Sequence, residues 1–223
     1  YQEEALSRTH AWAKRSLEKH LKLEKEKRSH SGKLLSRDSH SGLEVESNLF
    51  VAHVAESNFQ NSPQALFGIV QGGRSENLRK KSAQIIGAMD FDGFGIGGSF
   101  AKEDMSTAVK WVNEILPEEK PRHLLGIGEP EDLFMGVENG IDLFDCVGPT
   151  RLGRNGTLFT KNGKINLMNA QYVKDFSPIE NNCECYTCKS YTKSYLSHLF
   201  RAKEMEGATL ASIHNVYFIT KLV

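Results

Sequence analysis

The chain has 223 residues, 39% of them hydrophobic and 25% charged, which is enough for one large domain or for a domain with a smaller companion. Its 28 basic and 28 acidic residues cancel, which argues against nucleic-acid binding through bulk charge but not through a local basic patch. No apolar run approaches the roughly 18 residues of a membrane span, so we expect no membrane segment.

The first segment, residues 1–63, predicts a helix that leads into an insert. Residues 1–28 carry a loose apolar face and then a run of charges typical of a solvated helix. Residues 29–47 are rich in Ser, His and Gly. Their histidines suggest either a metal site or a loop, and we favour the loop because no rigid element holds the imidazoles in register.

The second segment, residues 64–150, predicts four strand–helix units. The predicted strands are apolar on both faces and alternate with helices, a pattern typical of a parallel sheet whose ligand site lies at the carboxyl ends of the strands. The strands are expected at 66–70, 91–96, 123–127 and 141–147, and the helices at 76–89, 103–116 and 130–140.

The third segment, residues 151–223, begins with a predicted β-hairpin that turns at Asn162-Gly163. A helix is expected from about Thr192, with Tyr195 on its inward side, and Gly207 is expected to end it.

A cysteine cluster lies between the hairpin and that helix. Cys183, Cys185 and Cys188 form a Cys-x-Cys-x2-Cys string, and His214 follows at a distance. The string is either a set of free thiols on a turn or a zinc site closed by His214. We favour zinc because of the spacing and because Cys146 is the one other cysteine in the chain. The clustering, with no signal-peptide pattern, predicts a reducing, cytoplasmic location.

An acidic side chain is expected at the end of the fourth strand. Asp145 either faces the ligand site or caps a turn, and spacing alone leaves both open. Arg151 and Arg154 flank the same place. With Lys161 and Lys164 they make either a phosphate-binding surface or ordinary solubilising charge.

Several motifs, read together and in order, resemble the tRNA-guanine transglycosylases of the bacterial type. The resemblance runs from about Leu66 to the C-terminus. The motifs that carry it are Gly68–Gly73 (GIVQGG), Phe91–Gly93, Ile96–Gly98, Phe144–Arg151 (FDCVGPTR), Arg154–Gly156, Gly163–Asn166 and the cysteine cluster with His214.

The resemblance implies an α/β fold of the (β/α)8 TIM-barrel type, with about half of the barrel present and a zinc-binding subdomain inserted. It also implies an enzyme that exchanges guanine at the tRNA wobble position for a 7-deazaguanine, preQ1 or queuine. Asp145 aligns with the nucleophile that attacks ribose C1′. Gln71 and Gly98 align with groups that read the purine, and Leu125 and Gly126 with the wall on which it lies.

The resemblance further implies the partners of the protein. Arg151 and Arg154 align with contacts to the tRNA anticodon loop. One structural zinc ion per chain is implied, and a homodimer is expected for the full-length protein.

The chain departs from the family pattern in three respects. Half the barrel is absent, and with it the general base and an aspartate that reads guanine. Residues 18–60 are longer and more charged than usual, and the loop Ser99–Glu103 is shortened, which leaves the choice of exchanged base open. The rival interpretations are a non-catalytic zinc-containing tRNA-binding subunit, which the presence of Asp145 disfavours, and an inactive scaffold fragment. We expect residues 1–223 alone to be inactive.

Overall fold

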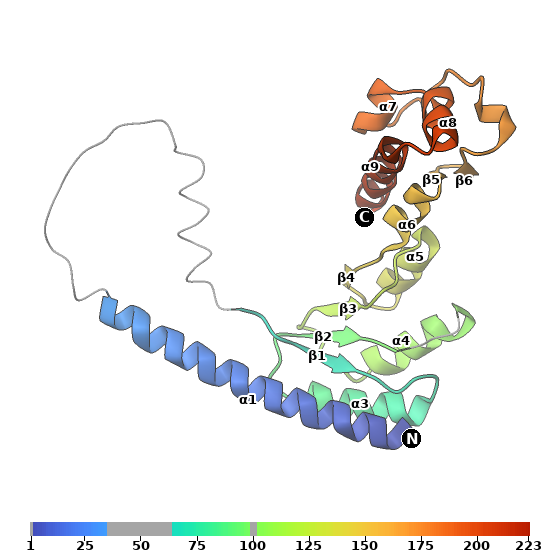
Figure 1. Ribbon diagram of the computed structural model, residues 1–223. Coiled ribbons are helices and arrows are strands. Elements are labelled where there is room, and N and C mark those ends of the chain that lie inside the picture. Colours follow the sequence, from blue (N-terminus) through green and yellow to red (C-terminus); the bar gives the residue numbers. More distant parts are fainter. Residues whose placement is uncertain (1, 35–63, 99–101) are drawn as a thin grey trace, which may run out of the picture. The chain divides into compact units, whose positions relative to one another are not determined.

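Helices and short strands alternate in the computed structural model, which describes residues 2–34, 64–98 and 102–223 (Figure 1). The chain divides into two units, residues 1–123 and residues 124–223. The division into segments 1–63, 64–150 and 151–223, which the sequence suggested, stays a prediction. Among the described residues, no helix combines the length and the apolar character that crossing a bilayer demands.

A pair of parallel strands forms the centre of unit 1. β1 (Phe67–Val70) pairs with β2 (Gly93–Ile96) in parallel, and Phe67 lies opposite Gly93. All residues of β2 are buried, as expected for a strand that is covered on both faces. In the sheet, the strands follow the order β1-β2-β3-β4. The α/β class with a parallel sheet is therefore confirmed, whereas closure into a barrel stays a prediction.

The helix after β1 contains residues that bond to the loops following β1 and β2. This helix, α3 (Glu76–Gly87), begins where the hydroxyl of Ser75 accepts a hydrogen bond from the Leu78 amide. Its apolar buried residues, among them Ala83 and Ile86, make up part of the core of unit 1. The other elements of unit 1 are α1 (Gln2–Leu34), the 3-10 helix η1 (Lys102–Asp104), α4 (Met105–Asn113) and β3 (Arg122–Leu124), the last of which ends in unit 2.

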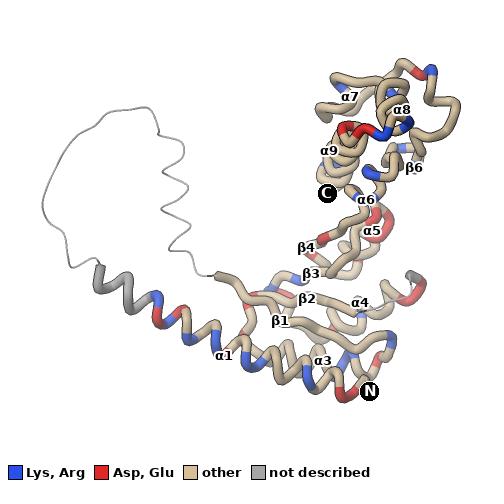
Figure 2. The backbone as a smooth tube through the Cα atoms, in the orientation of Figure 1, with Lys and Arg blue, Asp and Glu red and all other residues tan. Residues whose placement is uncertain are grey.

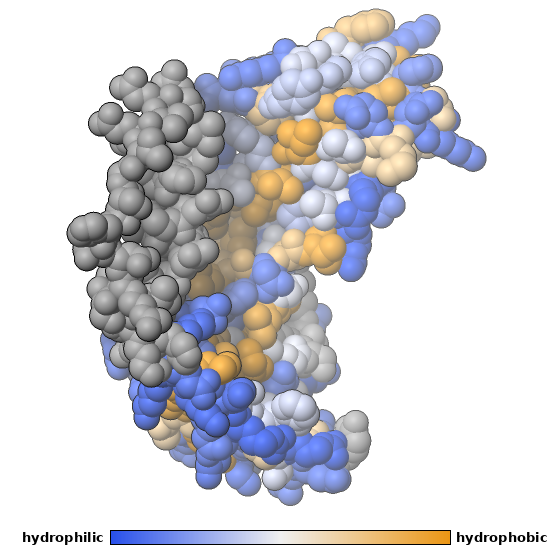
Figure 3. Space-filling view, turned by 60° about the vertical axis from the view of Figure 1, so that its left-hand side comes forward, coloured by the Kyte–Doolittle hydropathy of each residue, from blue (hydrophilic) through white to orange (hydrophobic). Residues whose placement is uncertain are grey.

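The first helix is longer than the sequence indicated. α1 continues to Leu34, into the insert, and the rest of that insert lies outside the described residues. Charged residues recur along α1 (Figure 2). Hydrophilic residues predominate on the side of unit 1 that the space-filling view presents (Figure 3). α1 packs against α3, where His10 Nε2 lies 3.2 Å from Ser82 Oγ.

In unit 2, the predicted strand over residues 141–147 is shorter than expected. β4 covers Leu143–Phe144, and α6 (Gly148–Arg154) begins soon after it. Pro149 lies in the first turn of α6, where its missing N–H costs no hydrogen bond and its fixed φ suits a helix. The segment that follows Asp145 is therefore the start of a helix. The helix before β4 is α5 (Pro130–Glu138).

The predicted hairpin is present with a different turn. β5 (Thr157–Thr160) and β6 (Gly163–Asn166) are antiparallel, and Thr160 pairs with Gly163. The loop is therefore Lys161-Asn162 rather than Asn162-Gly163. The Thr160 hydroxyl stabilises this loop, because it donates to Gly163 O at 2.6 Å and accepts from the Asn162 amide at 3.3 Å.

Two helices complete unit 2, where the sequence predicted a single one. α8 (Lys193–Ala202) is capped by Thr192 and ends where Lys203 adopts the left-handed conformation, with φ of 60°. α9 (Met205–Leu222) follows at once. The prediction that Gly207 ends a helix was wrong, because Gly207 is buried near the start of α9.

The predicted inward position of Tyr195 was also wrong. Its side chain is 43% exposed and stacks on Tyr191, with the ring centroids 5.3 Å apart. The remaining short elements of unit 2 are η2 (Ala170–Tyr172) and α7 (Tyr186–Ser190).

Close contact between α6 and α9 fixes the position of α6 within unit 2. A Cβ atom on Gly153 of α6 would lie 2.8 Å from the Ser212 amide nitrogen of α9, so this approach requires glycine. The core beside it is apolar and is formed by residues of the hairpin, α8 and α9, which include Leu158, Leu196 and Leu210. Since α6 follows the loop that contains Asp145, this packing also supports the candidate site.

Candidate functional site

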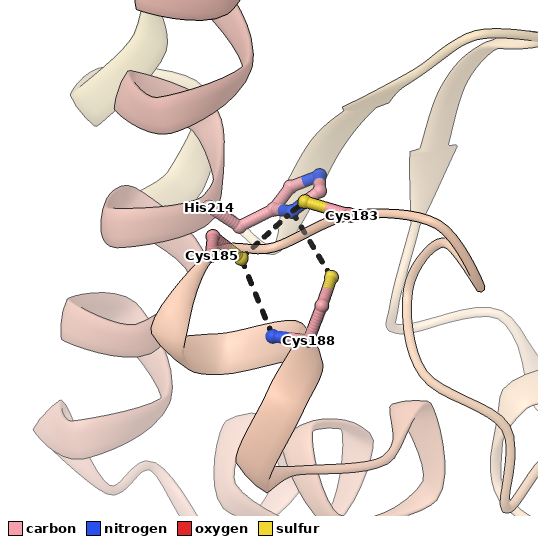
Figure 4. Close-up of side chains that lie close together, drawn as sticks. All are labelled: Cys183, Cys185, Cys188 and His214. Carbon is pink, nitrogen blue, oxygen red and sulfur yellow. Dashed lines mark hydrogen bonds between the residues drawn. The ribbon is translucent and has the colours of Figure 1, made fainter.

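Three cysteines and a histidine converge at one point of unit 2 (Figure 4). Nδ1 of His214 lies 3.8 Å from Sγ of Cys183, 3.5 Å from Sγ of Cys185 and 3.4 Å from Sγ of Cys188. All four ligand atoms lie within 4.8 Å of one another. Cys185, Cys188 and His214 are buried, whereas Cys183 is partly exposed. The structure thus brings together all four residues that the sequence predicted as metal ligands.

The hydrogen bonds of His214 give its ring the tautomer that a metal ligand needs. Nε2 lies 2.8 Å from the carbonyl oxygen of Phe159, which can only accept, so Nε2 carries the proton and Nδ1 presents its lone pair to the three sulfurs. Burial lowers the pKa of His214, which favours this neutral imidazole.

The cysteine segment is also attached to α9. Cys185 caps α7, because its sulfur accepts from the Cys188 amide at 3.3 Å. The buried hydroxyl of Thr187 donates to Leu210 O of α9 at 2.7 Å. Burial raises the pKa values of the Cys183 and Cys188 thiols, so a bound cation is what would favour their thiolates.

The geometry fits a tetrahedral metal ion. An ion bonded to sulfur at about 2.3 Å and to nitrogen at about 2.0 Å holds these ligands about 3.5 Å apart. The three distances from His214 Nδ1 to the sulfurs fall around this value. The Cys3His group is therefore able to bind a metal ion.

Asp145 lies directly after β4 and is exposed. Its Oδ1 accepts a hydrogen bond from the Gly126 amide at 2.9 Å, which joins the loop after β3 to the loop after β4. Gly126 has φ of 74°, and a Cβ built on it would meet nothing within 4 Å. The space beside the Gly126 backbone is therefore open. Leu125, beside it, is partly buried.

Gln71 and Gly98 lie close together in unit 1, at the carboxyl ends of β1 and β2. A Cβ on Gly98, whose φ is 105°, would lie 3.1 Å from Oε1 of Gln71. Gly98 is exposed and Gln71 is partly exposed. The predicted purine-reading residues are therefore neighbours within unit 1.

The four basic residues predicted near the site differ in their surroundings. Arg151 and Arg154 lie one turn apart on α6, and both are exposed. Lys164 is paired with Glu129 at 2.8 Å and also lies 5.6 Å from the ring centre of Phe159. Lys161 is exposed in the hairpin loop. The two arginines are thus the clearer candidates for contacts with phosphates.

Three buried polar residues were not predicted from the sequence. Arg79 and Ser82 of α3 are fully buried, as is Asn215 of α9. The sequence did contain a signal for Arg79 and Ser82, because these two polar residues interrupt the face of α3 that also buries Leu78 and Ile86.

Comparison with known proteins identifies the family. Residues 1–223 match the family described as TGT: Queuine tRNA-ribosyltransferase, so the match extends beyond the stretch from Leu66 in which the motifs lie. The chain is 53% identical over 163 residues to the queuine tRNA-ribosyltransferase of Thermoanaerobacter sp. (strain X514), covering 72% of this chain and 44% of that protein. It is 49% identical over 163 residues to the protein of the same name from Geobacillus kaustophilus, covering 72% of this chain and 43% of that protein.

The alignments also show how much of each relative the chain corresponds to. The chain spans less than half the length of the curated relatives that it matches. Since the family match covers all 223 residues, the chain belongs to the queuine tRNA-ribosyltransferase family.

Proposed function

We propose that this chain is the C-terminal portion of a tRNA-guanine transglycosylase, an enzyme that exchanges guanine at the tRNA wobble position for a 7-deazaguanine base. Membership of the family and the names of its relatives support the proposal. The observation that carries it is Asp145, an exposed carboxylate held by the Gly126 amide at the end of a sheet strand.

Asp145 acts as the nucleophile in this proposal. A carboxylate oxygen bonds to ribose C1′ while the bond from C1′ to N9 of guanine breaks, which leaves an aspartyl-ribosyl ester and releases guanine after N9 takes up a proton. The corresponding nitrogen of the incoming base then gives up its proton, bonds to C1′ and releases the carboxylate. A carboxylate suits this reaction, because it traps an oxocarbenium-like centre and can leave again. The target base must first leave its stack.

Four residues are proposed to recognise the base. Gln71 binds the purine edge through its side chain, and Gly98 through its backbone N–H. Leu125 and Gly126 form a wall for the flat face of the base, a role that the open space over Gly126 supports.

The tRNA is bound through Arg151 and Arg154, which contact the anticodon loop. Guanidinium groups suit phosphate oxygens because they donate two parallel hydrogen bonds. Exposure of both arginines on α6 supports this role. The full-length enzyme is proposed to act in the cytoplasm as a homodimer.

The metal is zinc, one ion per chain, with a structural role. Three thiolates and an imidazole are a preferred zinc donor set, and four protein ligands leave no position for a substrate. Held in this way, the ion joins the cysteine segment to α9.

The alternatives are a non-catalytic zinc-containing tRNA-binding subunit and an inactive scaffold fragment. The presence of Asp145 supports the enzyme over the first of these. The second concerns the isolated chain, because a catalytic general base is assigned to the part of the relatives that lies outside the aligned region.

The test is incorporation of radiolabelled guanine into tRNA by this chain, with and without the separately expressed N-terminal half of the Thermoanaerobacter relative. We expect no exchange by either polypeptide alone and exchange when the two are mixed. Full activity of the isolated chain would contradict the assignment of essential groups to the other half. Failure of the mixture, when both halves of the relative restore exchange, would contradict the proposed function.

A further inference from the structure

Two polar side chains are buried one turn apart on α3. Arg79 and Ser82 both have no exposed surface. Burial of a guanidinium ion is costly unless its hydrogen bonds are satisfied. Burial lowers the pKa of Arg79 to about 10, so the side chain still carries its charge at neutral pH. The buried face of α3 also contains Leu78, Ala83 and Ile86, so a cation there is unusual and its contacts are informative.

The contacts of Arg79 join the loops that follow β1 and β2. Its Nε donates to Gly73 O at 2.8 Å, and its Nη1 donates to Gly97 O at 2.8 Å. One rigid, planar group therefore fixes two backbone carbonyls from separate loops at the same edge of the sheet.

The bond to Gly97 also sets the direction of the next backbone donor. The carbonyl of Gly97 and the N–H of Gly98 belong to the same trans peptide group, so they point in opposite directions. With the carbonyl held by Arg79, the Gly98 N–H is directed away from α3. A cation on the carbonyl also polarises the amide, which strengthens the N–H as a donor.

Ser82 fixes the other purine-reading residue. The Gln71 amide donates to Ser82 Oγ at 3.2 Å, and the same oxygen is hydrogen bonded to His10 Nε2 at 3.2 Å. The side-chain oxygen of Gln71 in turn lies beside Gly98. Arg79 and Ser82 thus support, from one helix, both groups to which purine recognition is assigned.

We propose that Arg79 and Ser82 are positioning residues for purine recognition: Arg79 directs the Gly98 N–H toward the base, and Ser82 holds the backbone of Gln71. This inference rests on the proposed function for its consequence in catalysis. The geometric part, which concerns the order of the two loops, can be tested without any activity.

The geometric test is amide hydrogen exchange in the full chain, followed residue by residue by NMR. Ser82→Ala is expected to accelerate exchange at Gln71 about tenfold or more, because that amide loses its acceptor. Arg79→Met is expected to accelerate exchange at Gly97, whose amide donates to Val70 O at 3.1 Å. Gln84→Ala and Lys80→Met on the more exposed side of α3 are the matched controls, and should leave both rates unchanged.

The kinetic test uses the mixture of this chain with the N-terminal half of the Thermoanaerobacter relative. Arg79→Met should raise KM for guanine about tenfold, because the base loses one well-directed hydrogen bond. KM for tRNA should stay within about twofold of the parent value. Arg79→Lys keeps the charge without the two-pronged geometry, so its KM for guanine should be intermediate. It also serves as the test if Arg79→Met does not fold.

The outcomes separate the inference from the proposed function. Failure of the parent mixture to incorporate guanine, when the two halves of the relative do so, would overturn the proposed function. The amide rates would still decide whether Arg79 and Ser82 order the loops. An active parent with unchanged amide rates and unchanged KM for guanine in the variants would overturn the inference. An equal rise in both KM values would also overturn it, because it would show a general loss of structure.

Discussion

His214 and Asn215, adjacent on α9, bind both polar backbone groups of a single residue, Phe159 of β5. Nε2 of His214 donates to the Phe159 carbonyl at 2.8 Å, and the Phe159 amide donates to Oδ1 of Asn215 at 3.0 Å. The candidate metal ligand and its neighbour thus fasten the same strand residue to the helix. Orientation of the imidazole and the position of the hairpin therefore depend on each other.

Replacement of Asn215 should destabilise unit 2 strongly. The side chain has no exposed surface, and its amide group also donates to Pro149 O at 3.0 Å and to Thr157 O at 2.9 Å. Asn215→Ala removes all three bonds and leaves buried groups without this partner. We expect a loss of about 3 kcal/mol in the free energy of unfolding, measured with urea. The exposed Asn181→Ala is the control, and a loss no larger than its own would contradict the prediction.

One zinc ion per chain should be present in the folded protein and should stabilise it. Elemental analysis measures the stoichiometry, and thermal unfolding with and without a chelator measures the effect. Cys188→Ser should lose most of the metal and melt at a lower temperature, because a ligand is removed. Cys146→Ser is the matched control and should retain one zinc ion. Well-folded protein without metal, with the same Tm after chelation, would show that the cluster is not a structural zinc site.

The end of β1 and the cysteine cluster were predicted from the sequence because both depend on a local pattern. A short apolar run followed by Gln71 predicted a strand end, and the structure has β1 ending at Val70. The cysteine spacing, with His214, likewise predicted the group that converges in unit 2. The strand end and the three cysteines are local signals, whereas His214 was predicted because a three-cysteine string needs a fourth ligand from elsewhere in the fold.

Other features could not be read from the sequence because they depend on distant partners. Asn215 bonds to Phe159, which lies far from it along the chain, and no local pattern indicates this. Gly207 suggested a helix end, but a Cβ there would lie 3.0 Å from the Cβ of Leu199, so glycine allows close packing. Lys203 instead ends α8, although lysine rarely adopts the left-handed conformation.

A change of pH should reveal the contribution of Asp175 to the stability of unit 2. The pKa of Asp175 is lowered from 3.8 to about 2. The largest cause is the bond from Lys193 at 2.7 Å, and the second is the hydrogen bonding from Ser177. Because the pKa is lower in the folded state than in the unfolded state, the stabilisation is complete above the unfolded value. It is lost as the pH falls from about 4 to about 2.

The test compares Asp175→Asn with the parent in urea unfolding over this pH range. Since the pair is partly solvated, we expect a difference of about 1 kcal/mol at pH 7 that closes near pH 2. Asp90→Asn, at a carboxylate that is 91% exposed and pairs with Lys120, is the control and should show a smaller difference. A gap for Asp175→Asn that does not change with pH would contradict the ionic origin.

Gln71→Ala should weaken recognition of the base without affecting the covalent step itself. The substitution leaves purine edge groups without their partner, so KM for guanine should rise about tenfold. The backbone bond from the Gln71 amide to Ser82 Oγ does not involve the side chain, so the fold should persist. Steady-state exchange in the mixture with the N-terminal half of the relative measures the effect. An unchanged KM would exclude a role for this side chain in reading the base.

Asp145→Asn should abolish the covalent tRNA adduct and leave the fold intact. The Asn side chain has nearly the same shape, and its carbonyl oxygen can still accept from the Gly126 amide as Oδ1 of Asp145 does at 2.9 Å. The amide is, however, a poor nucleophile, so no ester to ribose C1′ should form. Denaturing gel electrophoresis of the mixture with labelled tRNA detects the adduct, and Tm checks the fold. Asp142→Asn, an exposed aspartate just before β4, is the matched control and should still form the adduct. A trapped adduct with Asp145→Asn would assign the nucleophile to another residue, whereas loss of adduct in both variants would point to a general effect on this loop.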